Sequence, residues 1–534
     1  MKSPSKKLIF LLLSIFFGST PSFAGTTSTR IVAPGVVHTE YLLPGPFTLD
    51  VLEVDLKNPL IQLESYRPNG LTRTSVQSAA NDHEGHRVIA AANADFFSFE
   101  TGWPVNNQVV DGKPAQGVTS VRSHLAVAET KKPYLEQFSF NGRLVAKNGS
   151  AIALSGVNTS RGAATTVLFT SFKGGSTGTD ASGIECSLTL ASPNWRTNDT
   201  LLFVVGSKQT AGNMAIPSSG AVLSAGSGTP ATFVTNILFV DDTVKVYVGF
   251  NPSNVKKIVQ LIGGAGRILK NGVNVSANSV SSEGIGTDFV TARHPRTFAG
   301  FNADTSKFYL CTVDGRQASS VGMSFNEMAS FLSSIKAWDA FNLDGGGSTT
   351  MVVRGVVVNS PSDPGGERSV ANSLQVISTA PTGTLSLLNI TEDRVDVFQG
   401  NTFQFHAEGK DQYFNPLPVP AGVVWNADAA IGTIDNNGLF SAKSVNDSGW
   451  VRIQYNAASD SARVYVRVVK ELRVFPQTLI MVPGERLTLS VRGTDSGDTR
   501  SLFKTIRLSI LIMLRGSTST PKGSSPLQAS AKAH

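Results

Sequence analysis

A carboxylate followed by three glycines and two hydroxyls is the stretch of this sequence best suited to chemistry. An apolar run ends there, and a second one begins after the residues Asp344, Gly345, Gly346, Gly347, Ser348 and Thr349. A strand that ends at an aspartate places the carboxylate at a sheet edge, and glycines let backbone N–H groups come close to a ligand. Asp-Gly also forms ordinary hairpin turns, which leaves a plain turn as the alternative. Three successive glycines exceed the need of a hairpin and favour a site.

Three other expected strand ends carry polar clusters. They are Asn93 with Asp95, then Arg293, His294 and Arg296, and then Asp314 with Arg316. Each cluster alone is also compatible with a turn or an ordinary ion pair. Together with Asp344 they describe a convergent pocket, with carboxylates for acid–base work and arginines for an anion.

Strands are expected to position these residues, because runs such as 47–56 alternate apolar and polar residues. A short helix is expected over 71–80. One clear helix begins at the capping box formed by Ser324 and Glu327. Its apolar face is a core face and comprises Phe325, Met328, Phe331, Leu332 and Ile335. The expected fold class is α+β: a mixed, strand-rich catalytic domain with few helices, followed by an all-β domain.

The first 24 residues are typical of a secretory signal peptide. Lys2, Lys6 and Lys7 precede the apolar run 8–17, and a small-x-small cleavage site ends at Ala24. That run is too short for a stable transmembrane anchor. We expect an exported protein, located in the periplasm, on the cell surface or outside the cell.

The basic residues of the chain gather at its two ends. Lys and Arg number 46 against 39 Asp and Glu, a net charge of +7. Three of the lysines lie in the signal, and six basic residues without any acid follow from Arg500 onward, which leaves the body slightly negative. No nucleic-acid partner is expected. The two cysteines, Cys186 and Cys311, either pair or are two buried small residues, and both alternatives stay open.

The run 342–349 resembles the hallmark of the phosphodiester glycosidase domain, the family of the N-acetylglucosamine-1-phosphodiester alpha-N-acetylglucosaminidases. The likeness continues through the segments 92–97, 263–272, 294–297, 313–316 and 367–372. It covers about 70–378 within an expected domain of 25–380. The part from about 125 to 255 fits the pattern poorly and is a possible insertion.

The resemblance implies a hydrolase that removes a sugar from a sugar-1-phosphodiester. In that reaction a carboxylate stabilises or attacks the oxocarbenium-like anomeric carbon, and arginines neutralise the leaving phosphate. We assign Asp344 and Asp314 as the acid/base or nucleophile pair, with Asp95 in reserve. The substrate-binding hypothesis comprises Arg296 and Arg316 for the phosphate, donors from Gly345, Gly346, Gly347 and Ser348, and Asn93, His294 and Asn372 for the sugar.

No cofactor is expected, although carboxylates at adjacent strand ends also suit a divalent metal ion. The expected partner is a glycan or a phosphate-linked sugar polymer. Two other functions stay open: a hydrolase of ordinary cell-wall or exopolysaccharide glycosidic bonds, and a non-catalytic glycan-binding surface adhesin.

Helix signals stop near Pro381, and the segment 381–469 resembles a bacterial Ig-like group 2 domain, which implies an all-β sandwich. Matching segments around Gly400 and Gly484 indicate that a second, truncated repeat begins over 470–499. The Ser/Thr-rich basic sequence 500–534 is expected to be a disordered tail.

Overall fold

The structure is a computed structural model that describes residues 25–475, 486–495, 502–503 and 508–511. It divides the chain into two compact units, Met1–Thr382 and Gly383–His534. The expected signal peptide, 1–24, lies outside the described residues. Strands dominate the described part and helices are few, which confirms the mixed, strand-rich fold class. Within that part, no helix is long and apolar enough to cross a membrane.

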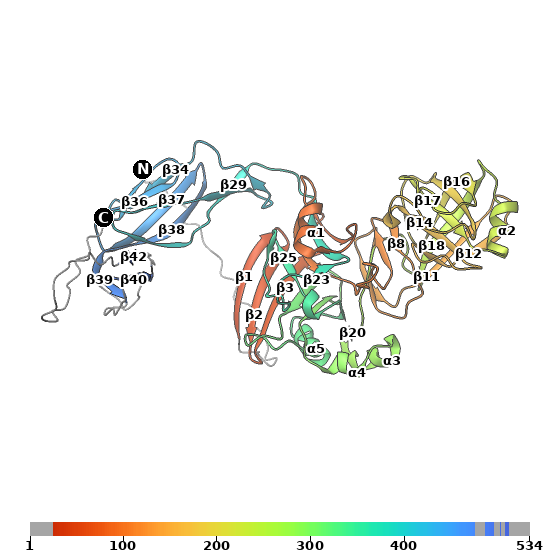
Figure 1. The fold of residues 1–534 in the computed structure, drawn as a ribbon, viewed down its shortest axis with the longest axis horizontal. Helices are drawn as coiled ribbons and strands as arrows, with labels where there is room; N and C mark the ends of the chain where they lie inside the picture. The colour runs from red at the N-terminus through yellow and green to blue at the C-terminus, as the bar shows by residue number, and fades with distance from the viewer. Residues whose placement is uncertain (1–24, 476–485, 496–501, 504–507, 512–534) are drawn as a thin grey trace, which may run out of the picture. The chain divides into compact units, whose positions relative to one another are not determined.

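The first unit is built around a central antiparallel sheet of eight strands (Figure 1). The strand order is β1 (Thr26–Ala33), β2 (Val36–Leu43), β3 (Phe47–Asp55), β23 (Lys307–Val313), β22 (Arg296–Phe301), β24 (Asp339–Asn342), β20 (Arg267–Lys270) and β21 (Val273–Asn274). Side chains alternate between its two faces along each strand. On β23, Phe308 and Leu310 enter one core, whereas Tyr309 and Cys311 enter another.

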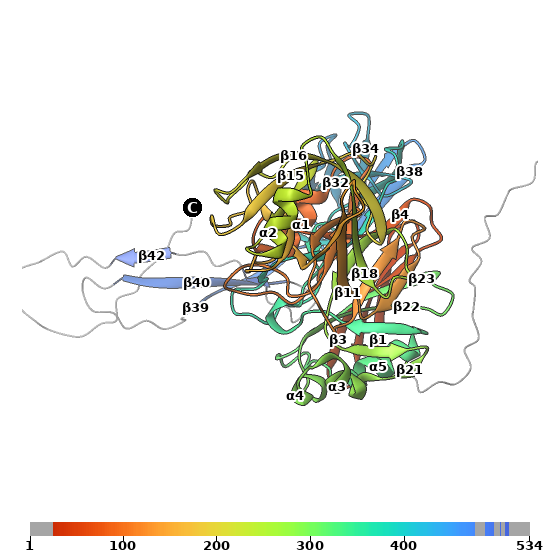
Figure 2. The ribbon, with the colours of Figure 1, turned by 90° about the vertical axis from the view of Figure 1, so that its right-hand side faces the viewer.

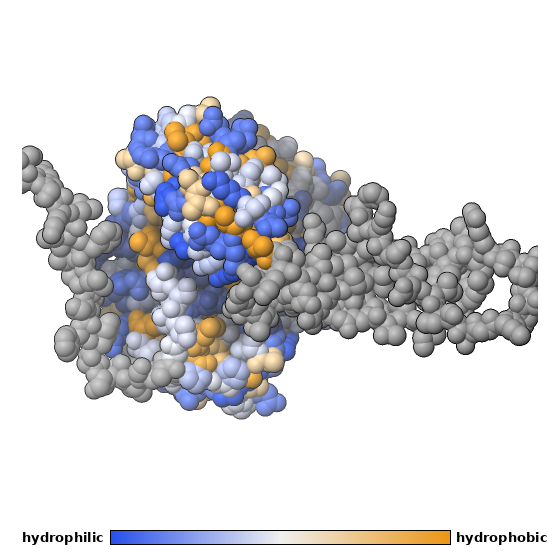
Figure 3. Space-filling view, turned by 90° about the vertical axis from the view of Figure 1, so that its left-hand side faces the viewer, coloured by the Kyte–Doolittle hydropathy of each residue, from blue (hydrophilic) through white to orange (hydrophobic). Residues whose placement is uncertain are grey.

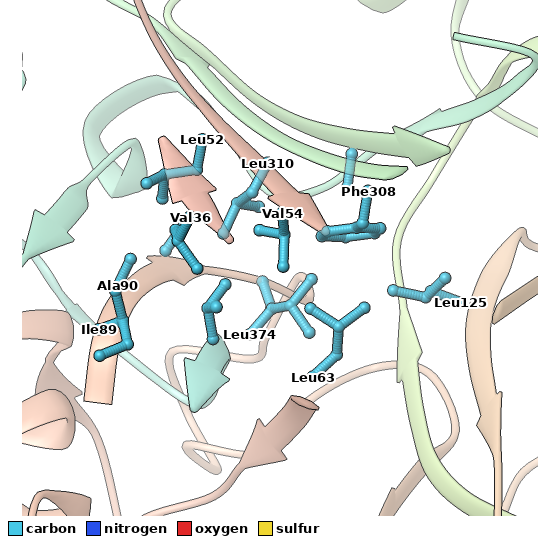
Figure 4. Packing of buried hydrophobic residues seen from close by; sticks show 14 of the residues in the cluster. Val36, Leu52, Val54, Leu63, Ile89, Ala90, Leu125, Phe308, Leu310 and Leu374 are labelled. Carbon is cyan, nitrogen blue, oxygen red and sulfur yellow. The ribbon is translucent and has the colours of Figure 1, made fainter. Parts of the chain in front are cut away.

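A second sheet packs on one face of the central sheet. Its order is β26 (Val356–Val357), β25 (Met351–Val353), β6 (Arg87–Asn93), β28 (Ser373–Ser378) and β4 (Ile61–Tyr66). Figure 4 shows the two layers meeting, with Leu52 and Leu310 from the central sheet near Leu63 and Leu374 from the second. This apolar interface fixes the two sheets against each other.

Helices cover the opposite face of the central sheet. They are α3 (Ser279–Glu283), α4 (Thr287–Thr291) and α5 (Phe325–Ser334), grouped on one side in Figure 1. The capping box of α5 is confirmed, since Ser324 and Glu327 make both reciprocal hydrogen bonds. The apolar face of α5 packs onto the sheet as expected. The helix expected over 71–80 is α1 (Thr74–Asn81), which begins after the short strand β5 (Thr72–Arg73); β5 pairs with β27 (Ser369–Val370).

A third sheet of five strands flanks this core. Its order is β10 (Pro133–Glu136), β9 (His124–Ala128), β19 (Ile258–Gly263), β7 (Gln108–Val110) and β8 (Lys113–Gln116). Leu125, Val127 and Ile262 from this sheet join the main core. The chain leaves this layer after β10 and returns to it at β19.

Between those two strands, residues 139–251 form a separate eight-stranded sheet, called here the insertion sheet (Figure 2). Its order is β12 (Ala151–Leu154), β11 (Ser139–Val145), β18 (Thr243–Asn251), β16 (Asp199–Gln209), β15 (Ile184–Leu190), β17 (Gly220–Ala225), β14 (Thr166–Thr170) and β13 (Gly156–Val157). Helix α2 (Thr229–Asn236) and the short η1 (Ser171–Lys173) belong to the same segment, which has its own apolar core. Cys186 lies in that core and Cys311 in the central sheet, and both thiols are free and buried.

The second unit consists of strands in its described part. One sheet contains β30 (Arg394–Phe398), β38 (Ala458–Arg467), β37 (Asp447–Tyr455) and β34 (Val424–Ala427); a second contains β29 (Leu385–Ile390), β32 (Ala407–Asp411) and β33 (Pro416–Leu417); a third contains β31 (Thr402–Gln404), β36 (Leu439–Ala442) and β35 (Gly432–Ile434). These strands share one apolar core. The Ig-like sandwich stays a prediction.

Four further strands follow in the sequence: β39 (Val469–Phe475), β40 (Arg486–Asp495), β41 (Leu502–Phe503) and β42 (Leu508–Leu511). The strands β41 and β42 fall within the expected disordered tail, and the rest of 500–534 lies outside the described residues. On the face shown in Figure 3, apolar and polar residues are interspersed, as on most folded surfaces.

Candidate active site

The order and direction of the strands bring the polar strand ends together. Strand β22 lies between β23 and β24 and runs antiparallel to both, with Arg296 opposite Val313 and Phe298 opposite Asn342. The start of β22 therefore lies beside the ends of β23 and β24. Asp314 follows the end of β23 directly, and Asp344 follows the end of β24 by two residues. The central sheet thus presents three of the predicted clusters at one edge.

Asn93 links this edge to the second sheet. It ends β6, and its buried side chain donates to the backbone carbonyl of Asp344 at 2.7 Å. Its side-chain oxygen accepts from the Thr297 hydroxyl at 2.6 Å and from the Thr350 N–H at 3.1 Å. All these partners are protein groups, so Asn93 holds the Asp344 turn in place. This differs from the predicted contact with a sugar.

Asp344 lies partly exposed at the start of the glycine turn. Its backbone N–H donates to the carbonyl of Ala94 at 2.7 Å, and the N–H of Gly345 donates to its carboxylate at 2.9 Å. Burial raises the pKa of Asp344 to about 6, although the Ser348 hydroxyl, the Gly345 N–H and the Arg368 charge act to lower it. A carboxyl with such a pKa changes its protonation state near neutral pH.

The glycines let charged groups approach this turn. Gly346 has a φ of +63°, a conformation that favours glycine, and its N–H donates to the Pro295 carbonyl at 2.8 Å. A Cβ on Gly346 would lie 3.1 Å from Nη2 of Arg316. The Arg316 guanidinium therefore lies directly against the turn. It is exposed, and no carboxylate of the described residues lies within ion-pairing distance of it.

A second arginine, Arg368, reaches the turn from the other side. It forms a two-bond ion pair with Asp363, at 2.7 and 2.9 Å, and its Nη1 donates to the Ser348 hydroxyl at 3.4 Å. A Cβ on Gly347 would lie 2.0 Å from Oδ1 of Asp363 and 2.1 Å from Nη2 of Arg368. A side chain at 347 would therefore displace this ion pair.

Arg296 occupies a different place from the one expected. Its guanidinium is buried and donates to the carbonyls of Phe289, Ala292 and Met323 at 2.6, 3.1 and 3.3 Å. It also lies 5.1 Å from the ring centre of Phe325. Burial, then the nearby Arg316 charge, lowers its pKa to about 10. Because its donors serve carbonyls of the helical layer, Arg296 supports the fold and does not offer the predicted phosphate contact.

Asp314 is buried, and both its oxygens are occupied. Oδ1 accepts from the side-chain amide of Asn359 at 3.0 Å, and the Ser360 N–H donates to both oxygens at 3.0 and 3.1 Å. Burial raises its pKa to about 6, and the charges of Asp50 and Glu40 act in the same direction. Asp314 thus holds the segment after β26. The sequence-based hypothesis instead assigns Asp314 to act on the substrate together with Asp344.

Asp95 is more deeply enclosed, with 1% of its surface exposed. Asn106 donates to both of its oxygens, from the backbone at 3.0 Å and from the side chain at 2.7 Å. Burial raises its pKa to about 7. The Asn372 side chain accepts from the Asp95 N–H at 2.8 Å and donates to Gln108 at 3.1 Å. Asp95 and Asn372 therefore hydrogen-bond each other and neighbouring protein groups; the reserve catalytic role of Asp95 and the sugar contact of Asn372 stay predictions.

His294 lies half-buried beside the two arginines of its segment. Burial, Arg296 and Arg316 all lower its pKa, so the ring is neutral at pH 7. A neutral imidazole beside an unpaired arginine can accept or donate a hydrogen bond to a sugar hydroxyl. This is compatible with its predicted role.

Sequence reasoning missed Arg368 and Asp363. Arg368 lies inside the segment 367–372, from which only Asn372 was selected. Arg368 could have been selected from the sequence, because it is an arginine within a segment that already resembles the family pattern. Within the described residues, no group of three or more His, Cys, Asp or Glu side chains is arranged to hold a metal ion.

Part of the chain is similar to known proteins. Residues 195–377 match the family model of the phosphodiester glycosidases. The chain is 30% identical over 157 residues to the N-acetylglucosamine-1-phosphodiester alpha-N-acetylglucosaminidase of Mus musculus, covering 28% of each chain. It is 38% identical over 87 residues to the SPbeta prophage-derived uncharacterized protein YomE of Bacillus subtilis (strain 168), covering 16% of this chain and 13% of that protein. The chain thus spans less than a third of either relative.

Among solved structures, a hypothetical protein from Synechocystis superposes with a TM-score of 0.53 at 19% identity, over 66% of this chain and 64% of that one. This likeness concerns the fold alone. The family match contains Arg316, Asp344 and Arg368, whereas Asn93 and Asp95 precede it. Residues 195–377 therefore carry a domain of the phosphodiester glycosidase family, and this domain contains the glycine turn and both of its arginines.

Proposed function

We propose that this protein hydrolyses sugar-1-phosphodiesters of the N-acetylglucosamine-phosphate type. The observation that carries the proposal is Asp344, a partly exposed carboxyl with a pKa near 6 in a glycine turn flanked by Arg316 and Arg368. The family match over 195–377 supports the same reaction class. Asp314 and Asp95 are buried and hydrogen-bonded to protein groups, which favours Asp344 as the carboxylate that meets the substrate.

The proposed reaction breaks the bond between the anomeric carbon and the phosphate oxygen. The Asp344 carboxylate stabilises or attacks the anomeric carbon as positive charge develops there. The phosphomonoester leaves with the electron pair of that bond, and Arg316 neutralises the charge on its oxygens. Water supplies the hydroxyl of the released sugar and a proton. Because the leaving group is already stable as an anion, one carboxylate is sufficient.

Arg368 acts on the turn through a hydrogen bond. Its ion pair with Asp363 fixes its guanidinium, which meets the Ser348 hydroxyl. The Ser348 hydroxyl in turn bonds the Asp344 carboxylate. We assign Arg368 as a positioning residue that keeps the carboxylate oriented and more acidic than burial alone would leave it.

The test is an assay of the purified protein on the methyl phosphodiester of N-acetylglucosamine 1-phosphate. Release of N-acetylglucosamine and methyl phosphate is expected, with a loss of about 10³-fold or more in kcat for Asp344→Asn. In water enriched in ¹⁸O, the label is expected on the anomeric carbon of the sugar. Label in the methyl phosphate would mean P–O cleavage and would refute a glycosidase.

Hydrolysis of phosphate-free wall polymers or exopolysaccharide, with no activity on the diester, would favour an ordinary glycosidase. Binding without turnover would favour an adhesin.

We also propose that the protein works outside the cytoplasm. The positive start, short apolar run and small-x-small site of residues 1–24 support this location. The test is expression of the full chain with a C-terminal tag. The mature protein is expected outside the cytoplasm, with an N-terminus at Gly25 by sequencing.

A further inference from the structure

A row of cationic and aromatic side chains leads from the candidate active site to the insertion sheet. We call it the basic–aromatic strip, and its members are Phe99, Trp103, Arg67, Lys173, Lys113 and Trp195. It begins at the glycine turn, because the Arg368 guanidinium lies 5.8 Å from the ring centre of Phe99. The strip is thus continuous with the residues that surround Asp344.

The first part of the strip belongs to the loop between β6 and β7. Phe99 is 73% exposed, and its ring centre lies 4.9 Å from that of Phe97. Phe97 forms an isolated β-bridge with Pro104, next to Trp103. An aromatic ring so exposed beside a polar turn leaves a large apolar area in water, unless a ligand covers it.

The second part joins this loop to the insertion sheet. The Trp103 ring has two cations near it, the Arg67 guanidinium at 3.9 Å and the Lys173 ammonium at 5.1 Å. Lys173 belongs to η1 of the insertion sheet. Farther along, the Lys113 ammonium lies 5.5 Å from the ring of Trp195, so each tryptophan of the strip has a positive charge near its ring.

None of these cations forms an ion pair with an acid. In the part of the chain that the structure describes, no carboxylate lies within ion-pairing distance of Arg67, Lys113 or Lys173, and the charge of Asp95 acts on Arg67 from farther away. By contrast, Lys147 in the turn after β11 pairs with Asp242 at 2.9 Å. Burial lowers the pKa of Lys113 and brings that of Arg67 to about 10. Positive charges that are partly buried without a counter-ion favour an anionic ligand.

We propose that the basic–aromatic strip binds the continuing chain of a polymeric substrate made of sugars joined by phosphodiesters. The exposed ring of Phe99 suits the apolar face of a sugar ring, and the arginine and lysines near the two tryptophans suit the phosphates between sugars. This inference rests on the proposed function for the nature of the bond at Asp344. It assigns the insertion sheet a role in substrate recognition.

The experiment compares binding of a length series, from one to about eight units, of linear poly(N-acetylglucosamine 1-phosphate). Binding is measured by calorimetry with the Asp344→Asn full-length chain, so that the ligand persists. Affinity is expected to rise with length, and added salt is expected to weaken the longer ligands most. The double variant Lys113→Gln/Lys173→Gln is expected to lose about fivefold in affinity per lysine for long ligands, and much less for the single unit.

The matched control is Lys245→Gln, which removes the same charge from an exposed position of β18 in the same sheet. It is expected to keep the length dependence, and circular dichroism checks that all variants fold. The proposal that the strip binds the polymer would be refuted if affinity did not rise with ligand length, or if it fell equally in the control variant. Equal binding of a single-stranded oligonucleotide with the same number of phosphates would refute its carbohydrate specificity. Length-dependent, lysine-dependent binding without hydrolysis by the unmutated protein would support the strip and reject the proposed hydrolase.

Discussion

The side-chain amide of Asn93 donates a 2.7 Å hydrogen bond to the backbone carbonyl of Asp344, 251 residues further along the chain. The same side chain accepts hydrogen bonds from Thr297 in the central sheet and from Thr350 before β25. One buried amide therefore joins the two sheets at the residue where the glycine turn begins. Any group at 93 that cannot donate will disturb that turn.

Asn93→Asp is expected to lower the free energy of unfolding by about 2–4 kcal/mol, because it leaves the Asp344 carbonyl without its donor and buries a charge. Urea unfolding followed by fluorescence measures the change. The control Asn148→Asp makes the same substitution in an exposed turn, where only the side-chain oxygen is used, by the Ser150 N–H. It is expected to stay within about 0.5 kcal/mol. Equal stability of the two variants would contradict the bridging role.

The acid limb of the pH profile is expected to follow Asp344. Its pKa is raised to about 6, so the carboxylate that the reaction needs is lost as the pH falls through 6. The kcat/KM for the methyl phosphodiester is expected to fall about tenfold per pH unit well below that value. In Ser348→Ala, which lacks one hydrogen bond to the carboxylate, the limb is expected to move to higher pH. A profile that is flat from pH 7 to pH 4 would exclude a catalytic carboxylate with this pKa.

Arg316→Gln is expected to raise KM and to lower kcat/KM by about 10- to 100-fold, because it removes the charge-assisted contact with the phosphate that we propose. Its thermal stability is expected to change little, since the side chain is exposed. The control is Arg293→Gln, another exposed arginine, whose guanidinium pairs with Glu327 of α5. That variant is expected to keep kcat/KM. Identical kinetics for Arg316→Gln and the unmutated protein would show that Arg316 does not bind the phosphate.

Arg296→Gln is expected to give the opposite result. It leaves carbonyls of Phe289, Ala292 and Met323 short of a donor, and each buried unsatisfied acceptor costs about 1–3 kcal/mol. A large drop in Tm is expected, with KM nearly unchanged for the protein that remains folded. A higher KM at full stability would restore the phosphate role predicted from the sequence.

Gly347→Ala is expected to lower kcat at least about tenfold, because its methyl group would collide with the Asp363–Arg368 ion pair that positions the turn. The control is Gly365→Ala in the neighbouring loop, where an added Cβ meets no atom within 4 Å. Steady-state kinetics of the two variants measure the difference. Full activity of Gly347→Ala would show that the ion pair is not needed.

Much of the site's location follows from local sequence patterns. The run that ends at Asp344, the capping box at Ser324 and the apolar face of α5 are all short-range signals, and the structure contains each of them. Strand ends with polar residues met at one edge because β22 lies between β23 and β24. The alternation of strands could be read from the sequence, whereas their order in the sheet depends on long-range pairing.

The roles of individual residues were harder to predict for the same reason. Arg296 and Arg316 look equivalent in sequence, but one is buried under carbonyls of the helical layer and the other faces the glycine turn. Asp314 and Asp344 differ in the same way, because Asn359 and Ser360 occupy the first. The type of a side chain states what it can bind, and the fold decides which partner it meets.

The two ends of the insertion sheet meet: Ser139 at the start of β11 is the register partner of Asn251 at the end of β18. Such partners have Cα atoms about 5 Å apart. The chain therefore enters and leaves this segment at neighbouring points. Changes in the length of a loop within it leave the route of the surrounding chain unaltered, so this sheet can vary in sequence while the glycine turn stays in place.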